Sequence, residues 1–224
     1  AHHSGNWGGL ISNPGIQLAH AIAALVSDKG EIKVPEWKPQ SLPESVRRVL
    51  ADCEVDGGPN GPVIEPDWGQ PGLSPAERVF GWCSFEVLAF KTGNPENPVN
   101  AIPPRAKANC QLRFVVGIDS NDILPALRRH LDKQGFDYVQ ITPSKDEVFK
   151  ATRIDPEDDW VNWAAKSLCL PCPKRRLMYG SQPNSLERQP TSQRADQTIN
   201  VIASSAMAPA PWAMACCLTC ANPA

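Results

Sequence analysis

Two adjacent histidines, His2 and His3, open the segment "HHSGNWGG", where small residues surround them. An imidazole can donate or accept a hydrogen bond, and glycines let a loop approach a substrate closely. The pattern therefore favours a loop that delivers one imidazole to a substrate. A frayed N-terminus or the remnant of an affinity tag would explain the same residues without any function.

Arg113 is a second candidate, in the segment "KANCQLRFVV" over residues 107–116. Apolar and polar residues alternate there, which predicts a strand with one buried face. The face expected to be buried carries Ala108, Cys110, Leu112, Phe114 and Val116, and Arg113 lies on the other. A guanidinium fixed on a strand suits a carboxylate bidentately, although a lone surface arginine more often pairs with a neighbouring acid.

The eight cysteines suggest a zinc ribbon, because Cys169 and Cys172 form one CxxC pair and Cys217 and Cys220 another. However, 44 residues separate the pairs, prolines crowd the first, and no hairpin pattern surrounds either. We therefore expect neither structural zinc nor a disulfide framework. The two remaining histidines, His20 and His130, lack the spacing of metal ligands and are expected on helix surfaces.

The first helix is predicted to begin at Pro14, with Asn13 as its cap and Gly30 as its stop. Its stripe of apolar residues is Ile16, Ala19, Ala23 and Val26, widened by Leu18, Ile22 and Leu25. Residues 31–81 are rich in proline and read as an insertion with one short helix near 43–51. Strands are predicted over 84–91, 107–116 and 138–142, and a second helix is predicted between 121 and 135.

These elements follow the order helix, strand, strand, helix, strand. One further strand before residue 1 would complete a ferredoxin-like βαββαβ domain of the α+β class, with a four-stranded antiparallel sheet and both helices on one face. We expect this domain to span residues 1–143, with the insertion at 31–81. A return segment with a helix follows at 144–168, and residues 169–224 lack periodicity and are expected to be poorly ordered.

The overall composition bounds the class of protein. The chain has 224 residues, a formal net charge of −2 and a pI of about 6.1, which argues against nucleic acid or an anionic membrane as partner. It contains neither a signal peptide nor an apolar run near the ~20 residues that span a bilayer. A cytoplasmic protein is expected, and the first residue, alanine, suggests a fragment.

Two motifs together resemble the M20 metallopeptidases, a family of carboxypeptidases, cytosolic dipeptidases and acetylornithine deacetylases. "HHSGNWGG" before a capped helix resembles the start of their lid, or dimerisation, domain, and "NAIPPRAKANCQLRF" resembles the same domain's later signature. The resemblance runs from residue 2 to about residue 168. It implies that His3 reaches into the partner subunit's active site and donates a hydrogen bond to the oxyanion. It also implies that Asn100 binds substrate and that Arg113 holds the substrate's terminal carboxylate.

The resemblance further implies two zinc ions, or cobalt or manganese, held by His, Asp and Glu of a catalytic domain that flanks the lid. This sequence contains no such ligand set, so we expect no metal on this chain and no activity from it alone. The expected protein is a fragment of a zinc-dependent hydrolase, homodimeric through the lid. It would cleave a peptide or N-acyl amide bond next to a free carboxylate.

The alternative is a non-catalytic dimerisation or interaction module of the same ferredoxin-like fold. An RNA-binding version is disfavoured, because the strand at 107–116 has no paired aromatic residues on which bases could stack.

Overall fold

The structure is a computed structural model that describes residues 2–56, 58, 61–143, 150–168, 176–178, 192–193 and 195–204. The helical elements are α1 (Ser4–Trp7), α2 (Pro14–Leu25), the 3₁₀ turn η1 (Pro35–Trp37), α3 (Glu44–Ala51), the π-helical turn η2 (Glu77–Gly81), α4 (Ile123–Lys133) and α5 (Asp159–Leu168). The strands are β1 (His2–His3), β2 (Glu54–Asp56), β3 (Ser84–Thr92), β4 (Ala101–Ile102), β5 (Arg105–Phe114), β6 (Gln140–Pro143), β7 (Thr152–Arg153), β8 (Arg176–Met178), β9 (Ser192–Gln193) and β10 (Ala195–Ser204). No helix in these ranges is long and apolar enough to cross a membrane.

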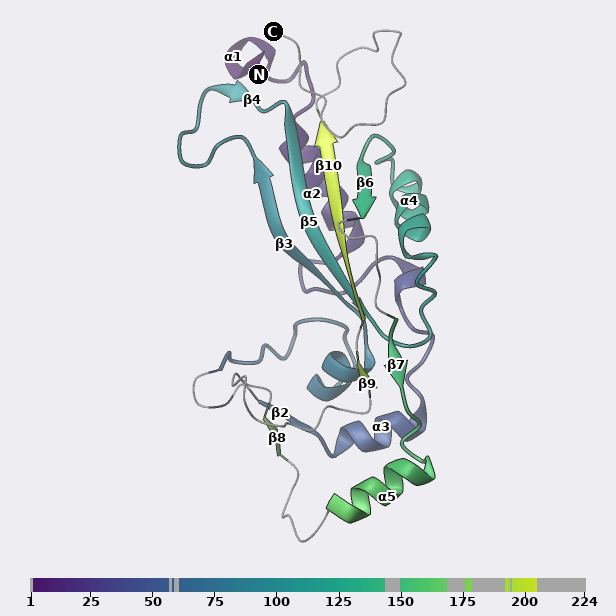
Figure 1. The fold of residues 1–224 in the computed structure, drawn as a ribbon. Coiled ribbons are helices and arrows are strands. Elements are labelled where there is room, and N and C mark those ends of the chain that lie inside the picture. The colour runs from purple at the N-terminus through teal and green to yellow at the C-terminus, as the bar shows by residue number, and fades with distance from the viewer. Residues whose placement is uncertain are drawn as a thin grey trace.

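The protein is a mixed α+β structure built on one four-stranded sheet (Figure 1). The strand order is β3-β5-β10-β6, and every neighbouring pair is antiparallel. The predicted strands over 84–91 and 107–116 are confirmed as β3 and β5, although β5 begins and ends two residues earlier than expected. Three two-stranded pairs complete the sheets of the described residues: β1-β4, β2-β8 and β7-β9.

One face of the sheet carries the main core. The alternation predicted for β5 is confirmed, since its buried residues are Ala106, Ala108, Cys110, Leu112 and Phe114. Leu18, Ala21 and Leu25 of α2 and Ala126, Leu127 and Leu131 of α4 pack in the same cluster. Both helices therefore cover one face, which leaves the face of Arg113 open.

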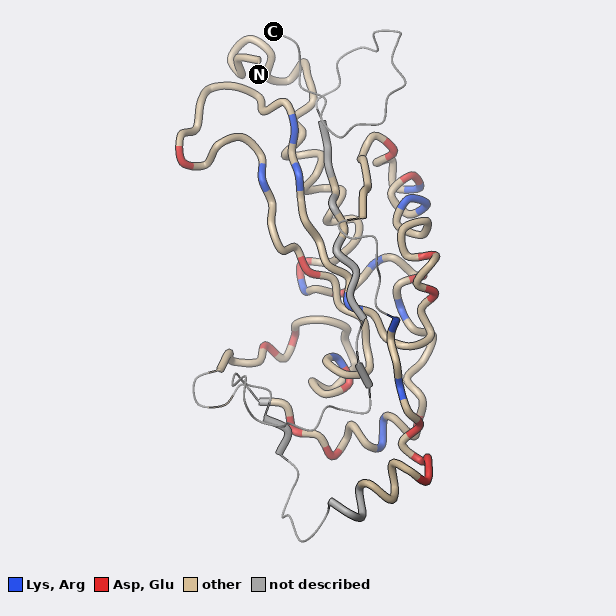
Figure 2. Tube along the Cα trace, viewed as in Figure 1, with Lys and Arg blue, Asp and Glu red and all other residues tan. Residues whose placement is uncertain are grey.

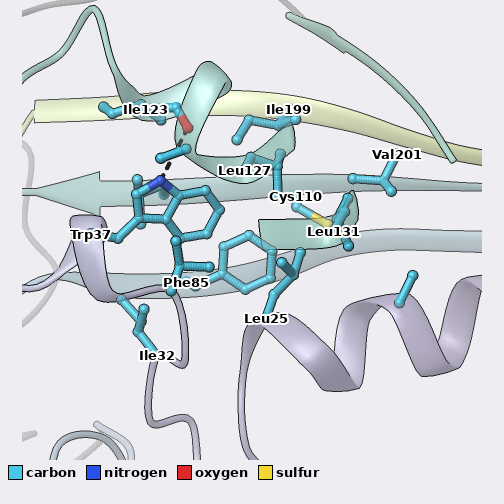
Figure 3. Packing of buried hydrophobic residues seen from close by; sticks show 14 of the residues in the cluster. Leu25, Ile32, Trp37, Phe85, Cys110, Ile123, Leu127, Leu131, Ile199 and Val201 are labelled. Carbon is cyan, nitrogen blue, oxygen red and sulfur yellow. Dashed lines mark hydrogen bonds between the residues drawn. The ribbon is translucent and has the colours of Figure 1, made fainter. Parts of the chain in front are cut away.

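Trp37 locks the start of the proline-rich segment into this core (Figure 3). Its side chain is fully buried, stacks on Phe85 at 5.6 Å between ring centroids, and donates from Nε1 to the carbonyl oxygen of Ile123 at 3.1 Å. Ile32 and Val34 are buried beside it. The predicted insertion thus begins as part of the main core.

The rest of the proline-rich segment forms a second, smaller apolar cluster. Its members are Leu42, Val46 and Leu50, from α3 and the residues before it, with Ala76 and Phe80 from η2 and the residue before it. Arg47 and Glu77 join the two elements through an ion pair at 3.0 Å. The short helix predicted near 43–51 is confirmed as α3.

Helix α2 begins as predicted, and it buries only part of the predicted stripe. Leu18 and Leu25 are buried and Ile22 and Val26 pack against the core, whereas Ile16, Ala19 and Ala23 are exposed, Ile16 by 61%. The residues that face the sheet are Leu18, Ala21 and Leu25. The predicted stop is wrong, since α2 ends at Leu25 where Val26 forms a β-bridge with Ile32.

We expect Asn13→Ala to lower the free energy of unfolding by about 1 kcal/mol. The Asn13 side-chain oxygen accepts hydrogen bonds from the backbone N–H groups of Gly15 and Ile16, at 2.9 and 3.4 Å, and so caps α2. Urea unfolding measures the change. Asn13→Asp keeps the acceptor and should retain the stability of the wild type. Equal losses in both variants would mean that capping is not the cause.

The segment after residue 168 departs from the expectation of poor order wherever the structure describes it. Residues 176–178, 192–193 and 195–204 are strands, and β10 pairs with β5 over ten residues and with β6 over four. Ile199 and Val201 of β10 are fully buried in the main core. The other residues of the predicted tail lie outside the described ranges.

The buried Cys110 makes stability depend on alkaline pH. Burial raises the pKa of its thiol from 9.0 to about 12. Between these values the unfolded chain loses a proton that the folded chain keeps, so stability is retained below pH 9 and falls as pH rises, by up to about 1.4 kcal/mol per pH unit.

Urea unfolding of the wild type and Cys110→Ala from pH 7 to 10.5 isolates this contribution. The stability difference should be constant below pH 8 and change progressively above pH 9. A difference that stays constant to pH 10.5 would contradict the raised pKa.

Candidate active-site loop

A short antiparallel ladder brings the two N-terminal histidines to the turn before β5. In the β1-β4 pair His2 lies opposite Ile102 and His3 lies opposite Ala101. The ladder continues in a hydrogen bond of 3.0 Å from the backbone N–H of Ser4 to the carbonyl oxygen of Asn100. His3 and Asn100, which are far apart in sequence, therefore lie on two neighbouring exposed segments, which β1 and β4 join at the same end of the sheet (Figure 1).

The ring of His3 is oriented by its own loop. The backbone N–H of Gly5 donates a hydrogen bond to His3 Nδ1 at 3.1 Å. A nitrogen that accepts carries no proton, so this bond favours the neutral tautomer with its proton on Nε2. His3 is exposed, and its Nε2–H is thus available as a hydrogen-bond donor to a ligand.

Steric constraints explain the glycines beside the histidines. A Cβ atom at Gly5 would lie 3.1 Å from Cε1 and 3.2 Å from Nδ1 of His3, and so would crowd the imidazole. A Cβ atom at Gly8 would lie 2.5 Å from the carbonyl oxygen of Ser4, and Gly9 adopts a φ of +81°. The bare backbone of "HHSGNWGG" therefore allows the tight turn of α1 and the position of the ring.

His2 differs from its neighbour. Its ring packs at a tilt on Trp7, with centroids 5.8 Å apart, and it is only half-exposed. This contact holds α1 against β1. Among the described residues of this segment, the ring of His2 packs on another ring and the ring of His3 does not.

The N-terminal elements carry no charged residue. No Lys, Arg, Asp or Glu precedes Asp28, and α1 and α2 are tan throughout Figure 2. The side of α2 that faces away from the sheet therefore carries no Lys, Arg, Asp or Glu. An exposed helix face without charges is unusual for a monomer and typical of an interface.

The third predicted site residue lies elsewhere. Arg113 is exposed near the far end of β5, opposite Ser84 of β3 and Asp196 of β10. Eight residues of extended strand separate it from Arg105, which corresponds to roughly 27 Å. The structure brings His3 and Asn100 together and leaves Arg113 at the opposite end of the sheet.

The other histidines occupy helices, as predicted. His20 is exposed on α2, and His130 lies near the end of α4 with Nε2 2.9 Å from the carbonyl oxygen of Ala24. The latter contact joins α4 to α2. The paired cysteines of the CxxC segments lie outside the described residues.

No metal-binding cluster is found in the described part of the chain. Nowhere in it do three or more His, Cys, Asp or Glu side chains gather closely enough to hold a metal ion. The described residues therefore do not form a site for the zinc ions that the resemblance implies.

The prediction of site residues missed two contributions of this loop. Ser4 fixes the loop through its backbone rather than its side chain, and Gly5 fixes the tautomer of His3 in the same way. A backbone N–H group is present in almost every residue, so residue types do not reveal these contacts, and the glycine is the one signal in the sequence. The exposed stripe of α2 was visible in the sequence, but its direction was not.

Two comparisons with known proteins concern the family of this chain. Residues 1–139 match the peptidase dimerisation domain of the M20 family. Among solved structures, the chain is similar to the M20 family metallo-carboxypeptidase Sso-CP2 from Sulfolobus solfataricus, with 25% identity and a TM-score of 0.49. That similarity covers 60% of this chain and 36% of the carboxypeptidase chain, and no curated protein matches. Because the model of this dimerisation domain matches more than half of the chain, the chain belongs to the M20 peptidase family.

Proposed function

We propose that this chain is the dimerising lid of a zinc-dependent M20-type hydrolase with a ferredoxin-like fold, and that His3 stabilises the transition state. The reaction is cleavage of a peptide or N-acyl amide bond next to a free carboxylate. The observation that carries the proposal is the Gly5 N–H bond to His3 Nδ1, which leaves an Nε2–H donor on an exposed loop. A donor of this kind suits the oxyanion that forms when an amide carbonyl is attacked.

Asn100 is proposed to assist at the same place. The β1-β4 ladder holds it beside His3, and its exposed amide can donate to one substrate group and accept from another. The metal ions would require ligands other than the residues described here. His3 and Asn100 would therefore act on a substrate that is held by a different part of the assembly.

The dimer surface is proposed to be the β3 edge together with the outer face of α2. Within the described residues β3 pairs only with β5, and its apolar residues Val87, Leu88 and Phe90 are 42%, 56% and 43% exposed. The neighbouring face of α2 exposes Ile16, and Gly15 packs against Thr92 at the end of β3. A second copy related by two-fold symmetry would cover both elements.

The two ends of β5 are proposed to serve different active sites of the dimer. A dipeptide spans only about 7 Å, so one substrate cannot touch His3 and Arg113 of the same lid, which the length of β5 keeps apart. A two-fold dimer resolves this, because His3 and Asn100 can serve the partner's site while Arg113 serves the site of its own subunit. Arg113 would hold the terminal carboxylate there.

The second candidate function is a non-catalytic dimerisation module. The lack of a metal-binding cluster among the described residues favours it. Both functions use the same dimer, and they differ only in whether His3 acts on a substrate. Substitution of His3 should leave dimerisation unchanged under either function and should alter turnover only under the first.

We expect the double variant Ile16→Lys/Phe90→Lys to weaken dimerisation at least about tenfold. Ile16 is 61% exposed and Phe90 is 43% exposed, so Ile16→Lys alone should change the subunit's own stability by less than about 0.5 kcal/mol and Phe90→Lys should cost more. Sedimentation velocity over a range of concentrations measures the dissociation constant. Val63→Lys, at an apolar side chain that is 91% exposed elsewhere, should leave it unchanged. A wild-type chain that stays monomeric, or equal constants in all three chains, would refute this surface.

A further inference from the structure

Three positively charged residues gather on the open face of the sheet, at the end near β4. Lys91 of β3 lies opposite Lys107 of β5 in the register, and Arg105 lies two residues before Lys107 on the same face. All three side chains are exposed, whereas the alternate residues Ala106 and Ala108 are buried on the core face. We call Lys91, Arg105 and Lys107 the basic cluster. Figure 2 shows Lys and Arg on both strands at this end of the sheet.

No acidic residue in the described part of the chain neutralises the basic cluster. Its three side chains form no ion pair with a described residue. Glu86 is the acidic residue of β3 and β5, and it lies opposite Gln111, towards the other end of both strands. Like charges directly opposite each other destabilise a sheet. A chain with a formal net charge of −2 therefore keeps a local excess of positive charge that does not serve its stability.

The spacing of the basic cluster fits two carboxylates of an extended peptide. Directly opposite residues have Cβ atoms about 5 Å apart, so one carboxylate can contact the ammonium groups of both Lys91 and Lys107. Arg105 lies about 7 Å further along β5, and its guanidinium can hold a second carboxylate bidentately. Side chains on one face of an extended peptide repeat at the same interval. Acidic residues at alternate positions of such a peptide would therefore match both places.

The rest of this face favours a peptide over a nucleic acid. The next outward positions of β5 carry Asn109 and Gln111, and those of β3 carry Ala89 and Glu86. None of these residues is aromatic, so bases would find no surface on which to stack. The amide of the half-buried Asn109 can donate to and accept from the backbone of a peptide that continues along β5.

We propose that the basic cluster binds an extended acidic peptide segment. One carboxylate lies between Lys91 and Lys107, and the carboxylate two residues away lies on Arg105. The chemical class of the ligand is a segment with aspartate or glutamate at alternate positions. Binding at this face uses neither the imidazole of His3 nor a metal ion, so it does not depend on the proposed hydrolase function.

The test uses the full chain and a fluorescently labelled seven-residue peptide with glutamate at its third and fifth positions and threonine elsewhere. Arg105→Gln/Lys107→Gln should weaken binding at least about tenfold in fluorescence anisotropy, because charge-assisted contacts to both carboxylates are lost. The matched control Lys29→Gln/Lys133→Gln removes two exposed positive charges outside the sheet and should change the dissociation constant less than about twofold. Equal binding by the wild type and the Arg105→Gln/Lys107→Gln variant would overturn the proposal.

Two further probes identify the ligand. A peptide with glutamates at its third and fourth positions has the same composition, but adjacent side chains of an extended chain point to opposite faces. It should therefore bind at least about threefold more weakly, and equal binding of the two peptides would contradict the spacing. An oligothymidylate that binds more tightly than the first peptide, and loses this affinity in the Arg105→Gln/Lys107→Gln variant, would make the cluster a nucleic-acid site and overturn the proposal.

A measurement on the wild type alone avoids any effect of the substitutions on folding. Bound carboxylates should slow the acetylation of Lys91 and Lys107 by an N-hydroxysuccinimide ester at least about threefold, as measured by mass spectrometry with and without saturating peptide. Lys133, which is exposed at the end of α4, should react at the same rate in both samples. Unchanged rates at Lys91 and Lys107, or equal slowing at all three lysines, would overturn the proposal.

Discussion

Replacing His3 by alanine should lower kcat about 10²–10³-fold, with little change in KM, in an M20 metallo-carboxypeptidase whose dimerisation domain is exchanged for this one. The reason is that, in the proposed role, the Nε2 side of His3, oriented by the Gly5 N–H bond to Nδ1, would donate to the charge that develops only in the transition state. An interaction of this kind contributes to turnover and not to substrate binding.

Two neighbouring substitutions serve as controls for His3. His2→Ala removes an imidazole that packs on Trp7 and should change kcat less than about threefold. Gly5→Ala crowds the His3 ring and should lower kcat by an intermediate factor while the imidazole itself is kept. A His3→Ala enzyme within twofold of the parent, or one in which only KM rises, would exclude the proposed role.

Trp37→Ala should lower the free energy of unfolding by about 3–5 kcal/mol, a large share of the stability of an ordinary domain. The side chain is fully buried between Phe85 and α4, so its removal leaves a cavity and takes the Nε1 bond from the carbonyl of Ile123. Trp37 also ties the start of the proline-rich segment to the main core. That segment should therefore loosen with the substitution.

Urea unfolding of three chains separates these contributions of Trp37. Trp37→Phe keeps an aromatic ring against Phe85 but loses the N–H donor, and it should cost about 1–2 kcal/mol. Trp160→Ala removes an indole that is 71% exposed and should cost less than about 0.5 kcal/mol. Equal losses for Trp37→Ala and Trp160→Ala would contradict the packing of the core.

Local signals in the sequence predicted the elements well. The Asn13-Pro14 pair starts α2 because the amide oxygen and the proline ring act within one turn of chain. The alternation of Ala108, Cys110 and Leu112 predicts the buried face of β5 because a strand has only two faces. The imidazole at His3 could likewise be singled out, since its small neighbours in sequence are also its neighbours in space.

Signals that depend on distant parts of the chain could not be read in the same way. Helix α2 is apolar on both sides, so periodicity alone does not tell the core-facing Leu18 from the exposed Ile16. The neighbour of β5 on the side of β6 is β10, and Ile199 and Val201 carry too short a pattern to identify that strand from the sequence. The distance between Arg113 and His3 follows from the length and direction of β5, and motif spacing does not encode that direction.

The central claim, that this lid delivers His3 to a partner's active site, is tested most directly by subunit complementation in the same chimeric carboxypeptidase. A subunit with His3→Ala is mixed with a subunit that is inactive through loss of a metal ligand of the host. If His3 acts across the dimer, heterodimers contain one working site, and a 1:1 mixture with random exchange should recover about a quarter of the parent activity. If heterodimers form and the mixture stays inactive, His3 does not act in the partner's site and the account of this lid is wrong.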